Sequence, residues 1–423
     1  MKPFVILSLL WFSIAVTPVS ANENIFRDTL NQFINKALAE NPELLEAGHQ
    51  IDVLKQIPSQ VSSLDDPMLQ LDLLNLPTDT FSFDQEPMTQ KRVTLSQKFP
   101  FPGKLGLRSS MAEKDVDISQ FTYEDLQLSI TRQVKQSYYE LCYVLAAIEI
   151  SRQNKTLLEQ FITITETKYS VGKGIQQDVI KAQVELSKLL NELIELNQRK
   201  EVEEARLNSL MNLPPNAPLS IAHGIAKTSF NYQMEDLFKV AEERRPAFKK
   251  LRSLREKYQA SRNLAEKEFY PDFKVGLSYS QREDSPLQDR ADFASAFIGI
   301  NIPLWHKNKQ GRKVAEESYR IDVIREAYNK TRNLTFLSIK ERLDKERKGA
   351  ETLKLIEKGI LPQARQSLES ALAGYSVDKV DFLTLLNNQV TLFNWELKYH
   401  RELTDYEINL AQLEQVVGQA LFD

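Results

Sequence analysis

Histidine, cysteine and methionine are among the residue types that bind metal ions, and cysteine and histidine can also act as nucleophiles; all three occur in this 423-residue chain. The lone Cys142 cannot form a disulfide within the chain and lies in a helical pattern, where we expect a small buried apolar residue. The methionines form no cluster, and the sequence contains neither a phosphate-binding glycine loop nor a nucleophile elbow. The four histidines lack the spacing of metal ligands (His49, His223, His306 and His400). The sequence therefore predicts no enzyme, no cofactor and no metal site.

Two segments about two hundred residues apart share a Tyr-Ser-Val opening and, fourteen residues later, a Gln-Val pair. One is YSVGKGIQQDV, which begins at Tyr169, and the other is YSVDKVDFLTL, which begins at Tyr375. Gly172 and Gly174 permit a tight reversal, because glycine adopts left-handed conformations readily. Asp178 is placed to cap the next helix at its positive end, and this cap could be its whole role. Each segment is predicted to be a helix–turn–helix tip.

The match between the segments extends outward over most of the chain. Residues 99–114 align with 302–317, and 37–47 resemble 239–251. This internal repetition predicts two tandem repeats, each with a helix, a strand pair, a very long helix, a tip turn and a return helix. The first repeat covers 22–212 (strand pair about 67–100, tip turn 169–178), a helix-breaking equatorial linker covers 213–232, and the second repeat covers 233–423 (strand pair about 271–303, tip turn 375–382).

The N-terminus has the pattern of a secretory signal peptide, predicted over residues 1–21. Lys2 precedes an apolar run from Phe4 to Val16, and small residues lead to a predicted cleavage after Ala21. An uncleaved anchor is the less favoured alternative, because a membrane-spanning helix needs about 20 apolar residues. No later stretch has eighteen consecutive apolar residues, so helical membrane spans are not expected.

Scarce glycine, 13 residues in all, indicates long uninterrupted helices, which we place at about 108–167 and 311–373. Each would be on the order of 90 Å long. The return helices carry apolar residues at the three-and-four spacing of a coiled-coil seam (Leu186, Leu189, Leu190, Leu193, Leu196 and Leu207, then Leu383, Leu386, Val390, Phe393, Leu397, Leu410 and Leu413). Such hairpins cannot form a core alone and are expected to pack laterally against others.

Four short segments alternate apolar and polar residues with the period of a strand, as in FASAFIGINI from Phe293. Their length fits tilted transmembrane strands of about 9–11 residues. A small soluble β-sandwich is the alternative. Four strands cannot close a transmembrane barrel, which needs about eight or more, and open strand edges in lipid would leave backbone groups unpaired. Several copies of the chain would therefore have to pool their strands, and three copies would supply twelve.

The signal peptide, the tandem halves, the strand pairs, the long hairpins and the tip pattern together resemble the TolC-type outer-membrane efflux proteins. Within that family, QEPMTQKRVTLSQKFPFPGKLGLR from Gln85 is most similar to members that serve heavy-metal pumps of the resistance-nodulation-division (RND) class. The resemblance implies a mainly α fold with a β-barrel portion. Coiled-coil hairpins would form a periplasmic α-barrel, and four transmembrane strands per protomer would complete a trimeric barrel.

The resemblance also implies roles for the tips at the periplasmic entrance. Docking of a periplasmic adaptor is expected at the first turns of both segments (Tyr169, Ser170, Val171, Gly172, Gly174, Tyr375, Ser376 and Val377). The pore entrance is expected near a second set (Asp178, Asp378, Asp381, Thr384 and Asn387). Thr384 and Asn387 stand where family members can carry acidic residues, and Val380 replaces a latch arginine. Asp378 and Asp381 are the nearby carboxylates that could compensate.

The function implied is that of a passive exit duct in the outer membrane of a Gram-negative bacterium. Its partners would be two further copies of itself, a periplasmic adaptor, an inner-membrane RND pump and outer-membrane lipid, and its mildly acidic net charge does not suggest nucleic acid. Heavy-metal cations are the expected cargo. Multidrug efflux or type I protein secretion by the same fold is an alternative, and a soluble periplasmic coiled-coil adaptor or scaffold is another.

Overall fold

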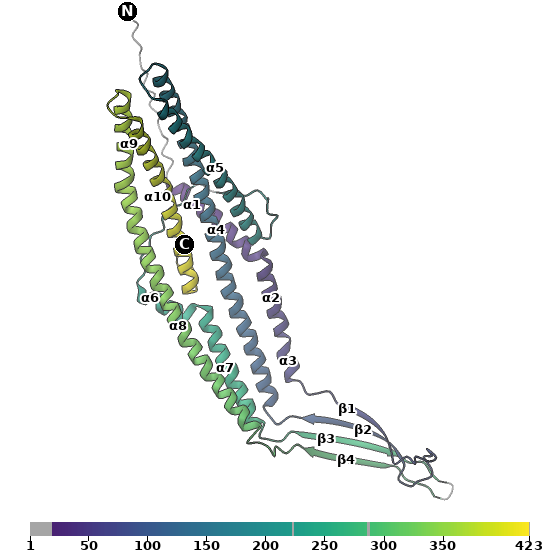
Figure 1. Ribbon diagram of the computed structural model, residues 1–423. Coiled ribbons are helices and arrows are strands. Elements are labelled where there is room, and N and C mark those ends of the chain that lie inside the picture. Colours follow the sequence, from purple (N-terminus) through teal and green to yellow (C-terminus); the bar gives the residue numbers. More distant parts are fainter. Residues whose placement is uncertain (1–18, 222–223, 286–287, 423) are drawn as a thin grey trace, which may run out of the picture. The chain divides into compact units, whose positions relative to one another are not determined.

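The computed structural model describes residues 19–221, 224–285 and 288–422 (Figure 1). Most of the predicted signal peptide lies outside them, and its cleavage stays a prediction. Helices account for most of the chain (α1 Val19–Glu40, α2 Pro42–Lys55, α3 Ile57–Ser62, α4 Lys104–Ser170, α5 Gln176–Leu210, α6 Met234–Arg244, α7 Pro246–Lys267, α8 Gln310–Leu355, α9 Leu361–Ser376 and α10 Phe382–Val417). The strands are β1 Met68–Leu74, β2 Gln90–Phe99, β3 Phe273–Gln281 and β4 Phe293–Ile300. The prediction of a mainly α protein with four strands is confirmed.

The chain divides into two compact units, and each draws on both halves of the sequence. One unit contains Met1–Leu45, Asp125–Ala241 and Thr335–Asp423, and the other contains Glu46–Glu124 and Glu242–Leu334. We call the first the helical unit and the second the strand unit. The predicted tandem repeats are therefore not separate compact units, and their boundaries stay a prediction.

In the strand unit, the four strands form one antiparallel sheet in the order β1-β2-β3-β4. Leu95 of β2 lies opposite both Leu69 and Leu277, and Leu277 lies opposite Ala296. Because directly paired residues share a face of a sheet, the register gathers most of the apolar residues on one face (Leu69, Leu71, Leu73, Val93, Leu95, Phe99, Phe273, Val275, Leu277, Tyr279, Ala294, Ala296, Ile298 and Ile300). We call this the apolar face of the sheet. Most of its large side chains are exposed.

The opposite face of the sheet is mostly polar, with residues such as Thr94, Ser96 and Ser278. A few apolar side chains also lie on it, and one of them, Phe297, requires a glycine beside it. A Cβ added at Gly276 would lie 2.4 Å from the Phe297 ring. Glycine therefore leaves room for the aromatic ring to lie against the strand.

In the helical unit, α4 and α5 form one hairpin and α9 and α10 form the second (Figure 1). A shared core includes Leu158 and Phe161 of α4, Leu189 of α5 and Phe393 of α10. Most of the predicted seam is buried or half-buried. Leu190 and Leu383 are exposed instead, because a stripe of leucines is wider than the surface that one partner helix covers. Cys142 is buried, as predicted.

The long helix predicted over about 311–373 is present as α8 and α9, but it is not α-helical throughout. A π-helical turn, Ile356–Ile360, lies between α8 and α9, and Pro362 is the second residue after it. Proline has no backbone N–H and its ring crowds the preceding turn, so an α-helical ladder cannot continue unchanged there. A wider π turn accommodates the defect without ending the helix.

Among the described residues, no helix is both long enough and apolar enough to cross a membrane.

Candidate functional site at the two helix–turn–helix tips

The two predicted tips have the same backbone geometry. Gly172 has φ +72° in the first tip, and Asp378 has φ +58° at the matching position of the second. The N–H of Lys173 donates to the carbonyl of Lys168 at 2.8 Å, and the N–H of Lys379 donates to that of Gly374 at 2.9 Å. Left-handed residues of this kind close helix ends, and aspartate is one of the few non-glycine residues that adopt the conformation at low cost.

The return helices begin differently in the two tips, and the predicted cap at Asp178 is wrong. Ile175 occupies the N-cap position of α5 and makes no side-chain cap. Asp178 lies one turn later, where its carboxylate still faces the positive end of the helix. In the second tip Asp381 is the N-cap of α10, and its Oδ1 accepts from the N–H of Thr384 at 2.6 Å.

Lys168 joins the first tip to the second. Its ammonium donates to the carbonyl oxygen of Tyr375 at 2.7 Å and to Oδ1 of Asp378 at 2.5 Å. The same Nζ lies 4.0 Å from the centre of the Tyr375 ring. The hydrogen bond and the charge of Lys168 hold the pKa of the Asp378 carboxyl below its usual range. One ammonium thus binds a carbonyl, a carboxylate and an aromatic face of the other tip.

The two tip tyrosines are not equivalent. Tyr375 is 7% exposed and packs on Phe382, with the ring centres 5.8 Å apart. Burial, together with the carboxylates of Asp178 and Asp378, raises the pKa of Tyr375. Tyr169 is half-exposed. The structure therefore places Tyr375 inside the helical unit and leaves Tyr169 at the surface.

The other residues expected at the docking surface lie on the outside of the turns. Val171 and Val377 are exposed apolar side chains at matching positions, and Ser170 and Ser376 are exposed beside them. Gly174 is packed so closely that an added Cβ would lie 3.1 Å from the N atom of Tyr169. The tips thus present a small apolar and hydroxyl surface on closely packed turns.

The residues expected at the pore entrance lie around the start of the return helices. Thr384 and Asn387 are exposed on α10. Burial raises the pKa of the Asp178 carboxyl, with the nearby Asp381 adding to the effect and Lys181 opposing it. Asp178 and Asp381, which belong to different tips, are therefore close enough to interact. Thr384 also lines a polar groove of about 490 Å³ between α9 and α10 (with Gln363, Gln366, Ser367, Ser370, Ala371, Val380 and Asn388).

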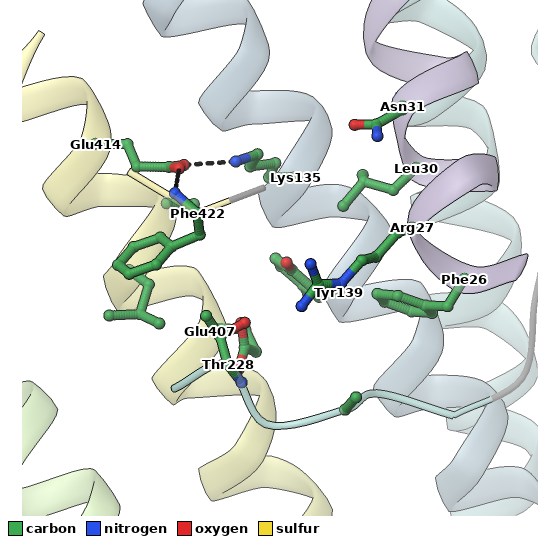
Figure 2. A pocket seen from close by; sticks show the side chains of 13 residues that line it. Phe26, Arg27, Leu30, Asn31, Lys135, Tyr139, Thr228, Glu407, Glu414 and Phe422 are labelled. Atoms are coloured by element: carbon green, nitrogen blue, oxygen red, sulfur yellow. Dashed lines mark hydrogen bonds and ion pairs between the residues drawn. The ribbon is translucent and has the colours of Figure 1, made fainter. Parts of the chain in front are cut away.

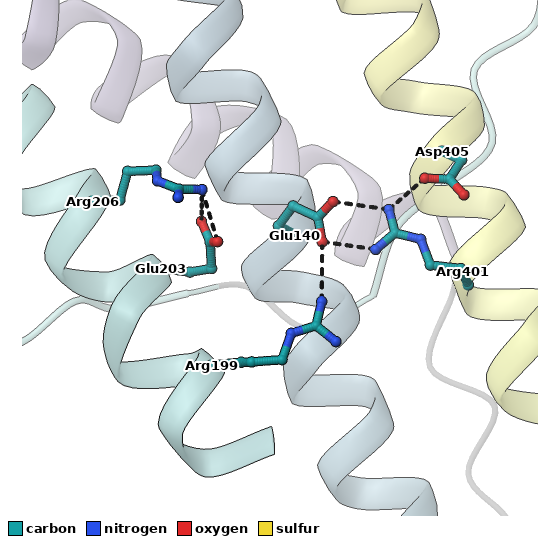
Figure 3. A network of polar contacts seen from close by, with 6 residues as sticks. All are labelled: Glu140, Arg199, Glu203, Arg206, Arg401 and Asp405. Atoms are coloured by element: carbon teal, nitrogen blue, oxygen red, sulfur yellow. Dashed lines mark hydrogen bonds and ion pairs between the residues drawn. The ribbon is translucent and has the colours of Figure 1, made fainter. Parts of the chain in front are cut away.

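Farther along the hairpins, a polar network ties the two hairpins together (Figure 3). Arg401 of α10 binds the Glu140 carboxylate of α4 through two nitrogens, at 2.7 and 3.0 Å, and also binds Asp405 at 2.6 Å. Arg199 of α5 lies 3.9 Å from the same Glu140 carboxylate. A two-nitrogen arginine–carboxylate pair fixes both distance and orientation, so the network holds three helices in register.

A second polar cluster surrounds a small cavity of about 70 Å³ in the helical unit (Figure 2). The Glu407 carboxylate accepts from the N–H of Thr228 at 2.7 Å and from its hydroxyl at 2.8 Å. Glu414 pairs with Lys135 at 2.5 Å and accepts from the N–H groups of Leu421 and Phe422. The cluster therefore fastens the linker and the C-terminal segment to α10.

Neither cluster has the composition of a metal site. Within the described ranges, no group of three or more His, Cys, Asp and Glu side chains could hold a metal ion. The carboxylates of the clusters bind arginine, lysine and backbone N–H groups instead.

Comparison with known proteins agrees with the arrangement of hairpins and sheet. The profile of the family described as "Outer membrane efflux protein" matches residues 33–213 and 237–419. The chain belongs to this family. It is an outer membrane efflux channel of the TolC type and not an enzyme.

The individual proteins that the chain is similar to are distant from it in sequence. The chain is 23% identical over 411 residues to the cobalt-zinc-cadmium resistance protein CzcC of Cupriavidus metallidurans, covering 96% of this chain and 93% of CzcC. The solved structure of VceC from Vibrio cholerae has a TM-score of 0.79 and 16% identity, over 95% of this chain and 99% of that one. The outer-membrane channel OprN has a TM-score of 0.79 and 16% identity, over 93% and 90%.

In this outer membrane efflux protein, sequence reasoning missed Lys168. The residue directly precedes the Tyr-Ser-Val motif, and its counterpart in the second repeat is Gly374. Nothing in the spacing indicates that this lysine reaches the opposite tip. Its three contacts arise only because α4 and α9 end side by side.

Proposed function

We propose that this channel is the exit duct of a tripartite efflux system and that three copies form it. The observation that supports this proposal most directly is the sheet. One of its faces is apolar and exposed, and its two outer strands, β1 and β4, each pair with only one other strand. Unpaired strand edges cannot lie in hydrocarbon, so the edges must be satisfied by other copies. Three copies would give a twelve-stranded barrel with the apolar face toward lipid.

The tips would form the periplasmic entrance. Three copies supply six tips of matching geometry, and an adaptor protein that brings pump and duct together would dock on their exposed turns at Tyr169, Val171 and Val377. Asp178, Asp378 and Asp381 would supply the charge at the entrance. Because Asp378 is already paired with Lys168, Asp178 and Asp381 would set most of the local field.

We further propose that the cargo is a heavy-metal cation, driven by an inner-membrane RND pump. The support is the overall likeness to CzcC, whose name describes cobalt, zinc and cadmium resistance. A duct needs no tight metal site of its own, because conduction requires weak binding.

Deletion of the gene tests the cargo. The strain should become sensitive to divalent heavy metals and keep its tolerance of drugs and dyes, and the intact gene supplied on a plasmid should restore growth. Drug sensitivity without metal sensitivity would contradict the metal proposal and favour multidrug efflux. Loss of a secreted protein from the medium would favour type I secretion.

Lys168→Met tests the role of the tips. The substitution removes an ion pair, a hydrogen bond and a cation–π contact that is itself worth about 0.5–1 kcal/mol at a partly exposed site. The purified variant should show a larger single-channel conductance in planar bilayers than the parent channel, because the two tips are no longer joined.

The matched control is Lys188→Met on α5, which removes an exposed pair with Glu185 within one helix. Its conductance should equal that of the parent channel. Equal conductance for all three proteins would mean that the tips are not the narrow point.

A further inference from the structure

The two connections that lead from the sheet into the long helices are built differently. In the first repeat, residues 100–103 join β2 to α4 in a short connection. The Lys104 side chain is only 5% exposed, and its Nζ binds Asp272 Oδ1 at 2.7 Å and the Tyr270 carbonyl at 3.1 Å. The Phe101 ring stacks on that of Tyr270, with centres 4.6 Å apart. The first connection is therefore short and held by an ion pair, a hydrogen bond and a ring contact with residues 270–272.

In the second repeat, residues 301–309 join β4 to α8, and the connection is longer and exposed. Ile302, Leu304 and Trp305 are all large apolar residues, and Trp305 is 74% exposed. The Trp305 carbonyl accepts from the N–H groups of Asn308 and Lys309, which fixes the turn without covering the ring. Exposing several neighbouring large apolar side chains to water is unfavourable. We therefore expect this patch to be covered by lipid or by another protein surface.

The position of this segment indicates what meets it. Ile298 and Ile300 belong to the apolar face of the sheet, and Ile302 continues their alternation past the end of β4. The exposed patch is thus continuous with the surface that faces lipid. Tryptophan has an apolar ring and one N–H donor, so it favours the boundary between hydrocarbon and water.

The charges of the segment agree with that boundary. Lys307 and Lys309 follow Trp305, and residues 302–309 contain no acidic side chain. Ammonium groups beside a membrane surface attract anionic lipid phosphates. A protein that covered this patch would need an apolar surface against Ile302, Leu304 and Trp305 and acidic groups beside Lys307 and Lys309.

We propose that residues 302–309 are an anchor in the phospholipid headgroup region on the periplasmic side of the outer membrane. Ile302, Leu304 and Trp305 insert at the hydrocarbon boundary, and Lys307 and Lys309 bind lipid phosphates. This inference rests on the proposed function, because it requires that the sheet spans the membrane.

A single-tryptophan channel tests the anchor. The chain has three tryptophans, Trp11, Trp305 and Trp395, so W11F/W395F leaves only Trp305. This variant is placed in phospholipid vesicles that contain lipids brominated near the headgroup or near the chain ends. Trp305 fluorescence should be quenched, and lipids brominated near the headgroup should quench it more strongly.

Two further single-tryptophan channels serve as controls. W11F/W305F leaves Trp395 on α10, which should not be quenched by either lipid. Ile298→Trp in a chain without native tryptophans places the ring on the apolar face of the sheet, where lipids brominated near the chain ends should quench it.

The outcomes separate the anchor from the duct. Quenching at Ile298→Trp without quenching at Trp305 would overturn the anchor and leave the duct intact. Absence of quenching at both positions, with no channel conductance, would overturn the duct and the anchor together. K307Q/K309Q should remove any preference of Trp305 for brominated anionic lipids over brominated zwitterionic lipids, and an unchanged preference would overturn the role of the lysines.

Discussion

At the scale of single residues, Glu407 has a distinctive environment. Its carboxylate is buried on α10 beside the cavity of Figure 2, and burial raises its pKa from 4.5 to about 7. Hydrogen bonds from Thr228 and the charges of Lys135 and Arg27 act in the opposite direction. The cost of desolvating the carboxylate outweighs these opposing interactions. The Glu407 carboxyl therefore gains or loses its proton near neutral pH.

The channel should therefore lose stability as the pH rises through about 7. The folded chain binds the Glu407 proton more tightly than the unfolded chain, so the contribution is complete below pH 4.5 and declines toward alkaline pH. Protonation of Glu407 contributes at most about 3 kcal/mol to the free energy of unfolding. The melting temperature of the parent channel in detergent should fall as the pH is raised from 4.5 through about 7. The melting temperature of Glu407→Gln should change less over the same pH range. Glu195→Gln, at an exposed position of α5, should behave as the parent, and a pH response that Glu407→Gln leaves intact would contradict this assignment.

At the scale of elements, the sheet has two faces of opposite character because its register is fixed along all four strands. Ile298 of β4 is 76% exposed on the apolar face, opposite Val275. Ser295 lies three residues earlier and points to the other face, opposite Ser278. Nearby residues of one strand therefore lie on opposite faces of the sheet, one apolar and one polar.

Substitution by lysine should separate the two faces. Ile298→Lys places a charge toward lipid and should cost about 2–4 kcal/mol near the middle of a bilayer. When outer-membrane fractions are run unheated on a gel, the variant should show little of the oligomer band that disappears on heating. Ser295→Lys has the same charge and strand, and it should assemble normally. Equal assembly of the two variants would show that the apolar face does not meet lipid.

At the scale of the whole molecule, each compact unit is built from both sequence halves. The strand unit takes two strands from each half, and the helical unit takes one hairpin from each half. Neither half has a complete sheet or a complete set of hairpins. We therefore expect the halves to fold together, and the open edges of β1 and β4 to be completed only by other copies.

The purified channel should be a trimer in mild detergent. Native mass spectrometry should give three times the mass of one processed chain, because three copies pair every strand edge. Residues 22–212 or 233–423 expressed alone should not produce this species, and the two halves expressed together provide the comparison. A stable monomer that conducts ions would contradict the three-copy barrel.

The amino-acid sequence by itself was enough to predict the strands, the long helices and the tips. These features depend on periodicity, on the scarcity of glycine and on a motif that occurs twice, and all three are local properties of the chain. The alternation around Ile298 and the glycine at position 172 indicate strand and turn without any knowledge of neighbours.

The tertiary structure alone decided which residues act together. Lys168 has no sequence signal, because its partners Tyr375 and Asp378 are about two hundred residues away. The difference between Tyr169 and Tyr375 is also invisible in the repeated motif, since only packing against Phe382 buries one of them. The raised pKa of Glu407 has the same origin: it depends on what surrounds the carboxyl in space, and local pattern carries no record of those surroundings.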